Sequence, residues 1–341
     1  MRAAIYQAAG QVVVADVPDA ALTTTTDAVV RVLRSCVCGS DLWAYRGIIT
    51  RPPGSRLGHE FIGIVEAVGE EVVTLSVGDL VVAPFQWSDN TCPACLDGLQ
   101  TACVNGGTFG AAGTDGGQGE AVRVPQADGT LVAVPGGLAA VGEQLLPGLL
   151  GLTDVVATGL HGAVLAGTDV GATVAVVGDG AVGLCAVLGA RQILGAERVI
   201  LMSRHPDRQL VGRAFGATDV VTLRGEDGIA AVRELTGGLG VRHVVEAVGT
   251  AVGMARDGGS IGAVGVPHTT PQLPLLDPFF HQLHISLGIA PVRHYLSDLI
   301  GRVSAGTLDP SPLFDLTLPL ESVAQGYAAM SARTSIKAML A

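Results

Sequence analysis

Two short segments in the first sixty residues carry side chains that bind transition metals. Cys38–Asp41, with the sequence Cys-Gly-Ser-Asp, follows an apolar run, and His59 and Glu60 open the next long apolar stretch. Thiolate and imidazole groups are good zinc ligands, and a catalytic zinc uses three protein ligands and keeps a fourth position open. Taken singly, Cys38 is also an ordinary core residue and His59 an ordinary loop residue. These two segments therefore leave both interpretations open.

A second group of possible ligands follows in the chain. Cys92, Cys95 and Cys103 stand close together, and Asp89 precedes the first of them by three positions. Six cysteines in a chain of this length favour metal ligands or buried thiols over a disulfide framework. A carboxylate is also a competent zinc ligand, and three thiols at this spacing are hard to explain except as metal ligands. The alternative is a lobe that keeps its thiols free.

A glycine-rich segment in the middle of the chain has the pattern of a dinucleotide-binding turn. Residues 178–183 read Gly-Asp-Gly-Ala-Val-Gly, after the apolar run Thr173–Val177 and before a helical stretch, Ala181–Leu194. In this pattern the first glycine permits a tight turn, the second lets the backbone approach a pyrophosphate, and the third brings the helix close to the strand. The backbone amides at the start of the helix would then hold the phosphates. The predicted cofactor contacts here are Gly178, Gly180, Ala181, Val182 and Gly183.

The end of the next predicted strand indicates which dinucleotide is bound. An NAD site places a carboxylate there for the ribose 2′-hydroxyl, whereas this chain has Ser203 and Arg204. A guanidinium forms charge-assisted hydrogen bonds with a phosphate, so NADP(H) is favoured and NAD(H) is the alternative. Arg208 is a possible helper, as is Arg224.

The elements that must position these residues fall into two kinds. Up to about residue 135 the chain reads as short strands separated by glycine and proline turns, which is typical of a compact β domain. From residue 142 strands and helices alternate, which predicts a doubly wound parallel sheet. We therefore expect an α/β protein with a β-rich catalytic domain, residues 1–148 and 292–341, and a Rossmann cofactor domain, residues 149–291, inserted into it.

One crossover in that second region is unusually short. Only residues 249–259 separate a predicted strand that ends at Val248 from one that starts at Ser260. This is fewer than the dozen or so residues that a parallel crossover usually needs.

Composition excludes several classes of protein. With 48% hydrophobic and 15% charged residues the chain is globular, and its net charge of −11 argues against a nucleic-acid surface. Met1–Ile5 begins a strand pattern at once, with no apolar signal segment. We therefore expect a cytoplasmic protein that does not bind membranes.

Taken together, the motifs resemble those of the medium-chain, zinc-dependent alcohol dehydrogenases over essentially the whole chain. The strand end at Ser203 is most similar to the NADP-dependent secondary alcohol dehydrogenases of that family. The resemblance implies a GroES-like catalytic domain and a homodimer or homotetramer. The matching segments are Cys38–Asp41, Gly58–Gly69, Gly78–Val81, Thr153–Ala163, Gly178–Gly183 and Val264–Pro267.

The resemblance also implies roles for single residues. Cys38, His59 and Asp154 would be the catalytic zinc ligands, with aspartate standing where many relatives have cysteine. Glu60 would approach the metal during ligand exchange, Asp41 would orient His59, and Ser40 would pass a proton from the substrate hydroxyl. Asp89, Cys92, Cys95 and Cys103 correspond to the four cysteines of a structural zinc lobe. Further cofactor contacts would be Thr158, Val248 and Val266.

One position departs from the pattern of many alcohol dehydrogenases. They have a histidine five positions after the first ligand to complete a proton relay, and this chain has Trp43. We expect Trp43, with Trp87, to shape the substrate pocket, and the relay beyond Ser40 to run through the cofactor ribose or water.

The function predicted from these residues is hydride transfer between NADP(H) and an alcohol or carbonyl compound, a secondary alcohol, ketone or aldehyde. A polyol or sugar dehydrogenase of the same superfamily is the alternative enzyme. A zinc-free quinone or enoyl reductase would lack Cys38 and His59. From a different class, a non-catalytic NADPH-binding sensor is the remaining alternative.

Overall fold

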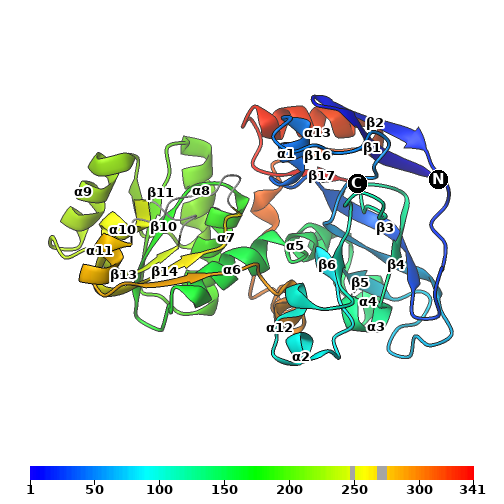
Figure 1. Cartoon of the computed structure of the whole chain (residues 1–341), viewed down its shortest axis with the longest axis horizontal. Helices are drawn as coiled ribbons and strands as arrows, with labels where there is room; N and C mark the ends of the chain where they lie inside the picture. Colours follow the sequence, from blue (N-terminus) through cyan, green and yellow to red (C-terminus); the bar gives the residue numbers. More distant parts are fainter. Residues whose placement is uncertain (246–249, 267–274) are drawn as a thin grey trace. The chain divides into compact units, whose positions relative to one another are not determined.

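The structure of the chain is a computed structural model that describes residues 1–245, 250–266 and 275–341. Contacts within the chain divide it into two compact units, shown in Figure 1. Unit 1 comprises Met1–Asp154 and Pro291–Ala341, and unit 2 comprises Val155–Ala290. Unit 2 is thus inserted in the sequence of unit 1.

Unit 1 is built on strands that run through both of its segments. The hairpin pairs β1 (Arg2–Ala8) with β2 (Gln11–Asp16), and a small ladder pairs β6 (Gln86–Trp87) with β7 (Gly107–Thr108). The main sheet has the order β16-β17-β3-β4-β5-β9, and β8 pairs with β3. Its strands are β3 (Ala28–Cys36), β4 (Phe61–Val68), β5 (Leu80–Val82), β8 (Ala121–Val124), β9 (Val132–Ala133), β16 (Leu316–Leu318) and β17 (Ala338–Leu340).

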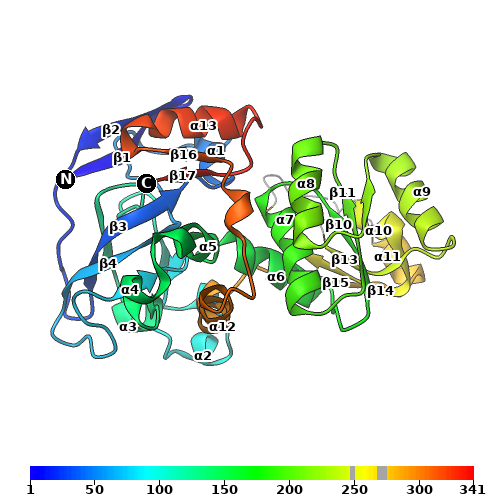
Figure 2. The same ribbon diagram turned by 180° about the vertical axis from the view of Figure 1, so that it is seen from behind.

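Short helices and one longer one surround these strands. At the carboxyl end of the chain α13 (Val323–Ser331) packs on β2 and β17 (Figure 2), and Tyr327 of α13 is buried in the cluster that joins them. The last strand of the chain thereby becomes part of the same sheet as β3. The other helices are α1 (Asp41–Tyr45), α2 (Pro93–Leu96), α3 (Ala127–Thr130), α4 (Gly137–Val141), α5 (Leu146–Gly151) and α12 (Val292–Ser304), with 3₁₀ turns η1 (Gln100–Ala102), η2 (Glu143–Leu145), η4 (Ser311–Leu313) and η5 (Leu320–Ser322).

Unit 2 contains a parallel sheet whose described strands follow the order β12-β11-β10-β13-β14-β15. Apolar runs fill its central strands; Val174, Ala175 and Val176 of β10 are all buried, as expected for a strand covered on both faces. The strands are β10 (Thr173–Val177), β11 (Arg198–Met202), β12 (Asp219–Val221), β13 (Val241–Val245), β14 (Ala255–Ala263) and β15 (His284–Leu287).

Helices cover both faces of this sheet. On one face α6, α7 and α8 pack side by side, and α9 and α10 pack against each other on the other face (Figure 1). Helix α8 shows how the sequence sets the limits: Pro206 stands in its first turn and Gly216, with a φ of 112°, ends it. The helices are α6 (Val155–Leu165), α7 (Ala181–Leu188) with the π-helical turn η3 (Gly189–Ile193), α8 (Pro206–Phe215), α9 (Gly225–Leu235), α10 (Thr250–Met254) and α11 (Leu276–Phe280).

The described part of the short crossover is a single helical turn, and the strand that follows it begins early. Helix α10 leads directly into β14, which pairs Ala255 with Val241 and resumes at Ser260 opposite His243 after a shift in register. The strand expected to begin at Ser260 therefore begins five residues earlier, at Ala255. Residues 246–249, including Val248, lie outside the described residues.

The α/β architecture predicted from the sequence is confirmed, with a β-rich unit and a doubly wound parallel sheet. The apolar run Thr173–Val177 forms β10, as expected, and the helix predicted after the glycine turn begins at Ala181. Among the described residues no single helix is long and apolar enough to cross a membrane, although one bent pair, Glu143–Gly151 with Val155–Leu165, meets that requirement by length and composition alone.

Candidate metal and cofactor sites

The three residues predicted to hold a catalytic zinc lie together in unit 1. Cys38 lies between β3 and α1, His59 directly before β4, and Asp154 at the end of the first segment of the unit. Asp154 Oδ2 lies 3.5 Å from Cys38 Sγ and 3.5 Å from His59 Nε2. With Glu60 included, one ligand atom from each residue lies within 4.8 Å of all the others. The segments after β3, before β4 and after α5 thus bring a thiol, an imidazole and carboxylates to one point.

This donor set fits a divalent zinc ion. Burial raises the pKa of the Cys38 thiol, and the carboxylates of Glu60 and Asp154 raise it further. A bound divalent cation acts in the opposite direction, because it stabilises the thiolate that coordinates it. One sulfur, one nitrogen and one carboxylate oxygen make a three-ligand set of the kind that leaves a fourth position for substrate.

A buried hydrogen-bond network fixes His59 from behind. Asp41 Oδ1 lies 3.5 Å from His59 Nδ1, and Asp41 Oδ2 accepts hydrogen bonds from the Cys38 amide at 2.9 Å and from Gln118 Nε2 at 3.3 Å. The hydroxyl of Tyr327 donates to Gln118 Oε1 at 2.9 Å. Burial lowers the pKa of His59, but the Asp41 carboxylate and Cys38 more than offset this and raise the pKa well above its usual value. Asp41 thus leaves His59 Nε2 facing Asp154.

Glu60 is held by a buried cation that the sequence analysis did not find. Lys337 Nζ donates to Glu60 Oε1 at 2.7 Å, and the two side chains are 1% and 0% exposed. Cys36 Sγ lies 3.3 Å from the other carboxylate oxygen. Burial lowers the pKa of Lys337, but the negative groups around it, Glu60 among them, raise it well above its usual value. The one available signal was that Lys337 is the only lysine in the sequence.

The remaining residues predicted near this site occupy two different surroundings. Ser40 directly precedes α1 and Trp43 lies within it, and both residues are half-buried. Trp87 in β6 packs edge-on against Phe109, with ring centroids 5.3 Å apart, at the border of the hydrophobic core of unit 1. The ring centroids of Phe85 and His59 lie 6.3 Å apart, which places an aromatic side chain beside one of the candidate metal ligands.

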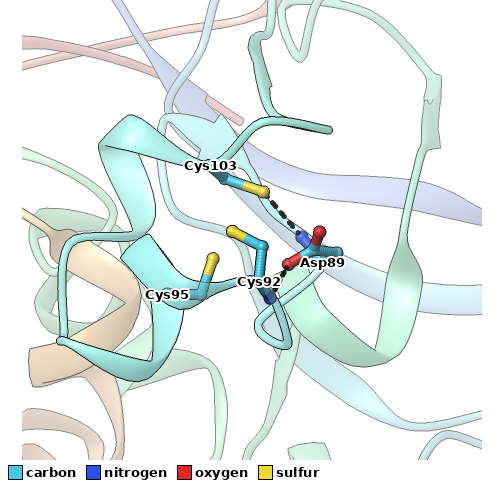
Figure 3. Close-up of side chains that lie close together, drawn as sticks. All are labelled: Asp89, Cys92, Cys95 and Cys103. Carbon is cyan, nitrogen blue, oxygen red and sulfur yellow. Dashed lines mark hydrogen bonds between the residues drawn. The ribbon is translucent and has the colours of Figure 1, made fainter.

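The second group of predicted ligands also converges. Figure 3 shows the thiols of Cys92, Cys95 and Cys103 pointing toward one another beside Asp89, and the four candidate ligand atoms lie within 4.8 Å of one another. The segment folds as a loop around α2 and η1. Hydrogen bonds from the backbone amides of Cys95 and Val104 lower the pKa of Cys92. Three thiols and a carboxylate fit a closed, four-ligand structural zinc site.

Asp89 also organises its own loop. Its Oδ1 accepts hydrogen bonds from the amides of Thr91 and Cys92 at 2.8 and 3.0 Å, and its Oδ2 accepts one from Asn105 Nδ2 at 2.8 Å. A cysteine side chain is a poorer acceptor for these donors. The aspartate therefore both presents a ligand oxygen and closes the turn.

In unit 2 the glycine turn has the geometry of a phosphate-binding loop. Gly178 has a φ of 112°, which favours glycine, and a Cβ on Gly183 would collide with the carbonyl oxygen of Gly178. This tight turn lets α7 begin at Ala181 and Val182, with only three residues between it and the end of β10. A dinucleotide fits this arrangement, because the free amides of the helix face the turn.

The other predicted cofactor residues lie on neighbouring elements of unit 2. Ser203 and Arg204 directly follow β11, where Ser203 is buried and Arg204 exposed. Arg208, in the first turns of α8, donates from Nη1 to the carbonyl oxygen of Asp179 at 3.1 Å. Thr158 lies in α6, and Val266 is 52% exposed after β14. Val248 lies outside the described residues.

Two family descriptions match this chain. The alcohol dehydrogenase GroES-like domain matches residues 24–136, and the zinc-binding dehydrogenase domain matches residues 181–304.

Three relatives illustrate the likeness. A probable zinc-binding alcohol dehydrogenase of Mycobacterium tuberculosis is 36% identical over 342 residues, covering 98% of this chain and 86% of its own. The structure of alcohol dehydrogenase TADH from Thermus sp. ATN1 superposes with a TM-score of 0.92 at 34% identity, covering 100% of this chain and 99% of the other. A putative zinc-binding dehydrogenase from Sinorhizobium meliloti bound to NADP gives a TM-score of 0.84 at 25% identity, covering 99% and 98%.

Fold, sites and relatives together define an oxidoreductase. The chain belongs to the medium-chain, zinc-dependent alcohol dehydrogenase family. Membership implies a zinc ion and a nicotinamide cofactor, and a small alcohol as substrate.

Proposed function

We propose that this protein transfers a hydride between NADP(H) and a secondary alcohol, ketone or aldehyde, at a zinc ion held by Cys38, His59 and Asp154. The observation that carries the proposal is the convergence of these three ligand atoms, with Asp41 behind His59 and Glu60 beside them. When bound, the zinc polarises the substrate oxygen and the nicotinamide gives or takes the hydride.

Other side chains of this protein orient the metal ligands, transfer a proton and shape the pocket. Asp41 holds the imidazole of His59 in one orientation, so that Nε2 stays directed at the ligand cluster. Ser40 exchanges a proton with the substrate hydroxyl. Phe85, beside His59, and Trp43 exclude water from the reacting atoms, and Trp87 limits the pocket farther out.

The preference for NADP(H) is supported by three observations. Position 203 is a serine and not an acidic residue. Arg204 is exposed and has no ion-pair partner among the described residues. A structural relative at 25% identity is bound to NADP. The exposed guanidinium of Arg204 can form charge-assisted hydrogen bonds with a 2′-phosphate.

The same proposal includes a structural zinc at Asp89, Cys92, Cys95 and Cys103, and a homodimer or homotetramer in the cytoplasm. Among the described residues, exposed apolar side chains gather on α11 and just before it: Leu275, Leu276, Phe279 and Phe280 are 68% to 76% exposed. Such a patch is more extensive than single surface apolar residues and favours association. Light scattering of the purified chain would test the oligomeric state.

The experiment that tests the function measures turnover with NADP(H) and NAD(H) on secondary alcohols, ketones, aldehydes and polyols. We expect activity in wild type and none above background in Cys38→Ala, while NADPH binding, followed by its fluorescence, is retained. Cys185→Ala is the matched control, because Cys185 is a buried thiol in unit 2. Full activity in Cys38→Ala contradicts the zinc assignment. Turnover of polyols alone supports a polyol dehydrogenase, and cofactor binding without turnover of any substrate supports a sensor.

A further inference from the structure

The second residue of the glycine turn, Asp179, carries a buried carboxylate that is tied to the end of the neighbouring strand. It is 5% exposed. Its Oδ2 accepts a hydrogen bond from Ser203 Oγ at 2.9 Å and one from the Arg204 amide at 3.2 Å, and it lies 2.7 Å from His205 Nδ1. All of these groups directly follow β11. Asp179 therefore fixes the segment that ends the second strand of the sheet.

These contacts bring a carboxylate to the end of β11, where the strand's own residue, Ser203, carries none. In an NAD site the acidic residue belongs to the end of the second strand itself, the position of Ser203 in this chain. Here the Ser203 hydroxyl is instead a donor to Asp179, so the negative charge reaches the same strand end from the glycine turn. The other carboxylate oxygen, Oδ1, has Arg208 Nη1 at 3.9 Å, beyond hydrogen-bond distance. That oxygen retains the capacity to accept a further hydrogen bond.

Charges of both signs thus meet at this strand end. Burial raises the pKa of Asp179, but hydrogen bonds from His205 and Ser203 lower it to a net value below normal, so the carboxylate is ionised at neutral pH. Arg204 is exposed and Arg208 is largely buried, and both are cationic. A 2′-phosphate would be attracted by the guanidinium groups and repelled by Asp179. An unphosphorylated ribose would instead be a donor for Oδ1, which accepts no hydrogen bond from the described part of the chain.

We propose that Asp179 is a specificity-determining residue for the nicotinamide cofactor, whose carboxylate takes the part of the strand-end acid of an NAD site and opposes the preference for NADP(H) that Arg204 creates. The proposal rests on the proposed function, since it concerns the cofactor of that reaction. The preference between NADP(H) and NAD(H) is then the difference between the attraction of Arg204 and the repulsion of Asp179 for the 2′-phosphate. Removing either side chain shifts that preference.

The test measures the binding of two nucleotides, one with and one without the 2′-phosphate, and requires no turnover. Isothermal titration with 2′,5′-ADP and with 5′-AMP gives the ratio of their affinities in wild type, in Asp179→Asn and in Asp207→Asn. Asparagine keeps a carbonyl oxygen for Ser203 and the Arg204 amide, so the turn is retained. We expect Asp179→Asn to raise the ratio in favour of 2′,5′-ADP about tenfold, the scale of one charge pair in a partly solvated site.

Asp207 is the matched control, because it is an exposed acidic residue in the first turn of α8, close in sequence to the same arginines. We expect Asp207→Asn to change the ratio less than about twofold, as is usual for screened surface charges. If Asp179→Asn fails to fold, Asp179→Ser, which keeps a short polar side chain, replaces it in the same titration.

The possible results separate the two proposals. An unchanged ratio in a folded Asp179 variant that binds both nucleotides overturns the role of Asp179 and leaves the proposed function standing. The same rise in Asp207→Asn would also overturn it, since general charge would then be the cause. A folded wild type that binds neither nucleotide overturns the proposed function, and the role of Asp179 with it.

Discussion

Lys337 and Glu60 form an ion pair, 2.7 Å between Nζ and Oε1, that is buried on all sides although the residues are separated by 277 positions. The pair joins the last strand, β17, to the turn that carries His59. Its cation comes from the only lysine in the sequence. Lys337 therefore neutralises the Glu60 carboxylate, which lies beside the candidate metal ligands, and fixes its position.

Lys337→Met should therefore destabilise unit 1, because it leaves the Glu60 carboxylate buried without a partner. Breaking a buried pair in this manner costs about 3 to 5 kcal/mol. Thermal unfolding of Lys337→Met, Glu60→Gln and the double variant measures the coupling. We expect the double variant to be more stable than Lys337→Met, and Lys337→Arg to lose least. A double variant that melts below Lys337→Met would contradict a charge-pair explanation.

The contrast between what the sequence predicted and what it did not follows from chain separation. The strand β10, the helix α8 and the glycine turn follow local patterns, which are a continuous apolar run, Pro206 at a helix start and Gly178 at a positive φ. Cys38, His59 and Asp154 were found because family motifs mark them. Lys337 has no such motif, and its partner Glu60 precedes β4, which is separated from β17 by β3 in the sheet and by most of the chain in the sequence.

Asp179 and Gln118 were missed for a related reason. In the glycine pattern Asp179 occupies a position whose residue type is not specified, and a sequence does not say which strand end its side chain will face. Gln118 links Asp41 to Tyr327, residues 77 positions before and 209 after it. Such networks depend on three distant segments meeting, and single-sequence patterns report only local periodicity.

The lobe around Asp89 should hold a zinc that acts on stability and not on chemistry. Metal analysis of wild type should give about two zincs per chain, and Asp89→Ala about one. The same variant should melt at a lower temperature yet keep its kcat, because the lobe is separate from Cys38 and His59. Asp89→Cys, which restores a thiolate ligand, is the control and should keep both ions. One zinc in wild type, with Cys92, Cys95 and Cys103 all reacting freely with a thiol reagent, would show that the lobe binds no metal.

The pair of Asp219 with Arg198 predicts part of the acid sensitivity of unit 2. Arg198 donates from Nε and Nη2 to the two carboxylate oxygens at 2.9 and 2.8 Å, and this lowers the pKa of Asp219 to about 2. Because the folded pKa is lowered, the stabilisation is complete above the unfolded pKa of about 3.9 and is lost as the pH falls toward 2. It amounts to about 1 to 2 kcal/mol at neutral pH, for a partly exposed pair.

Asp219→Asn should accordingly lower the melting temperature at pH 7, and the difference from wild type should shrink as the pH falls from about 4 to about 2. Differential scanning calorimetry across that range measures it. Asp298→Asn, which removes an exposed carboxylate paired with Arg302 on α12, is the control and should cost much less at pH 7. A difference between Asp219→Asn and wild type that stays constant down to pH 2 would mean that the carboxylate charge is not its source.

Arg204 should be the residue that creates the preference for NADP(H). Its side chain is exposed beside the end of β11, its backbone is fixed by Asp179, and it has no ion-pair partner among the residues described. Charged hydrogen bonds contribute about 1.5 to 3 kcal/mol, which corresponds to about tenfold to a hundredfold in affinity. Arg204→Ala should lower kcat/KM for NADP(H) relative to NAD(H) by that factor, mainly through KM, since the guanidinium binds a part of the cofactor that does not react. Arg213→Ala, which removes an exposed arginine in the last turn of α8, is the control and should leave the ratio within about twofold. If Arg204→Ala leaves the ratio unchanged, or wild type already prefers NAD(H) and the variant does not deepen that preference, the 2′-phosphate is bound by other residues or not at all.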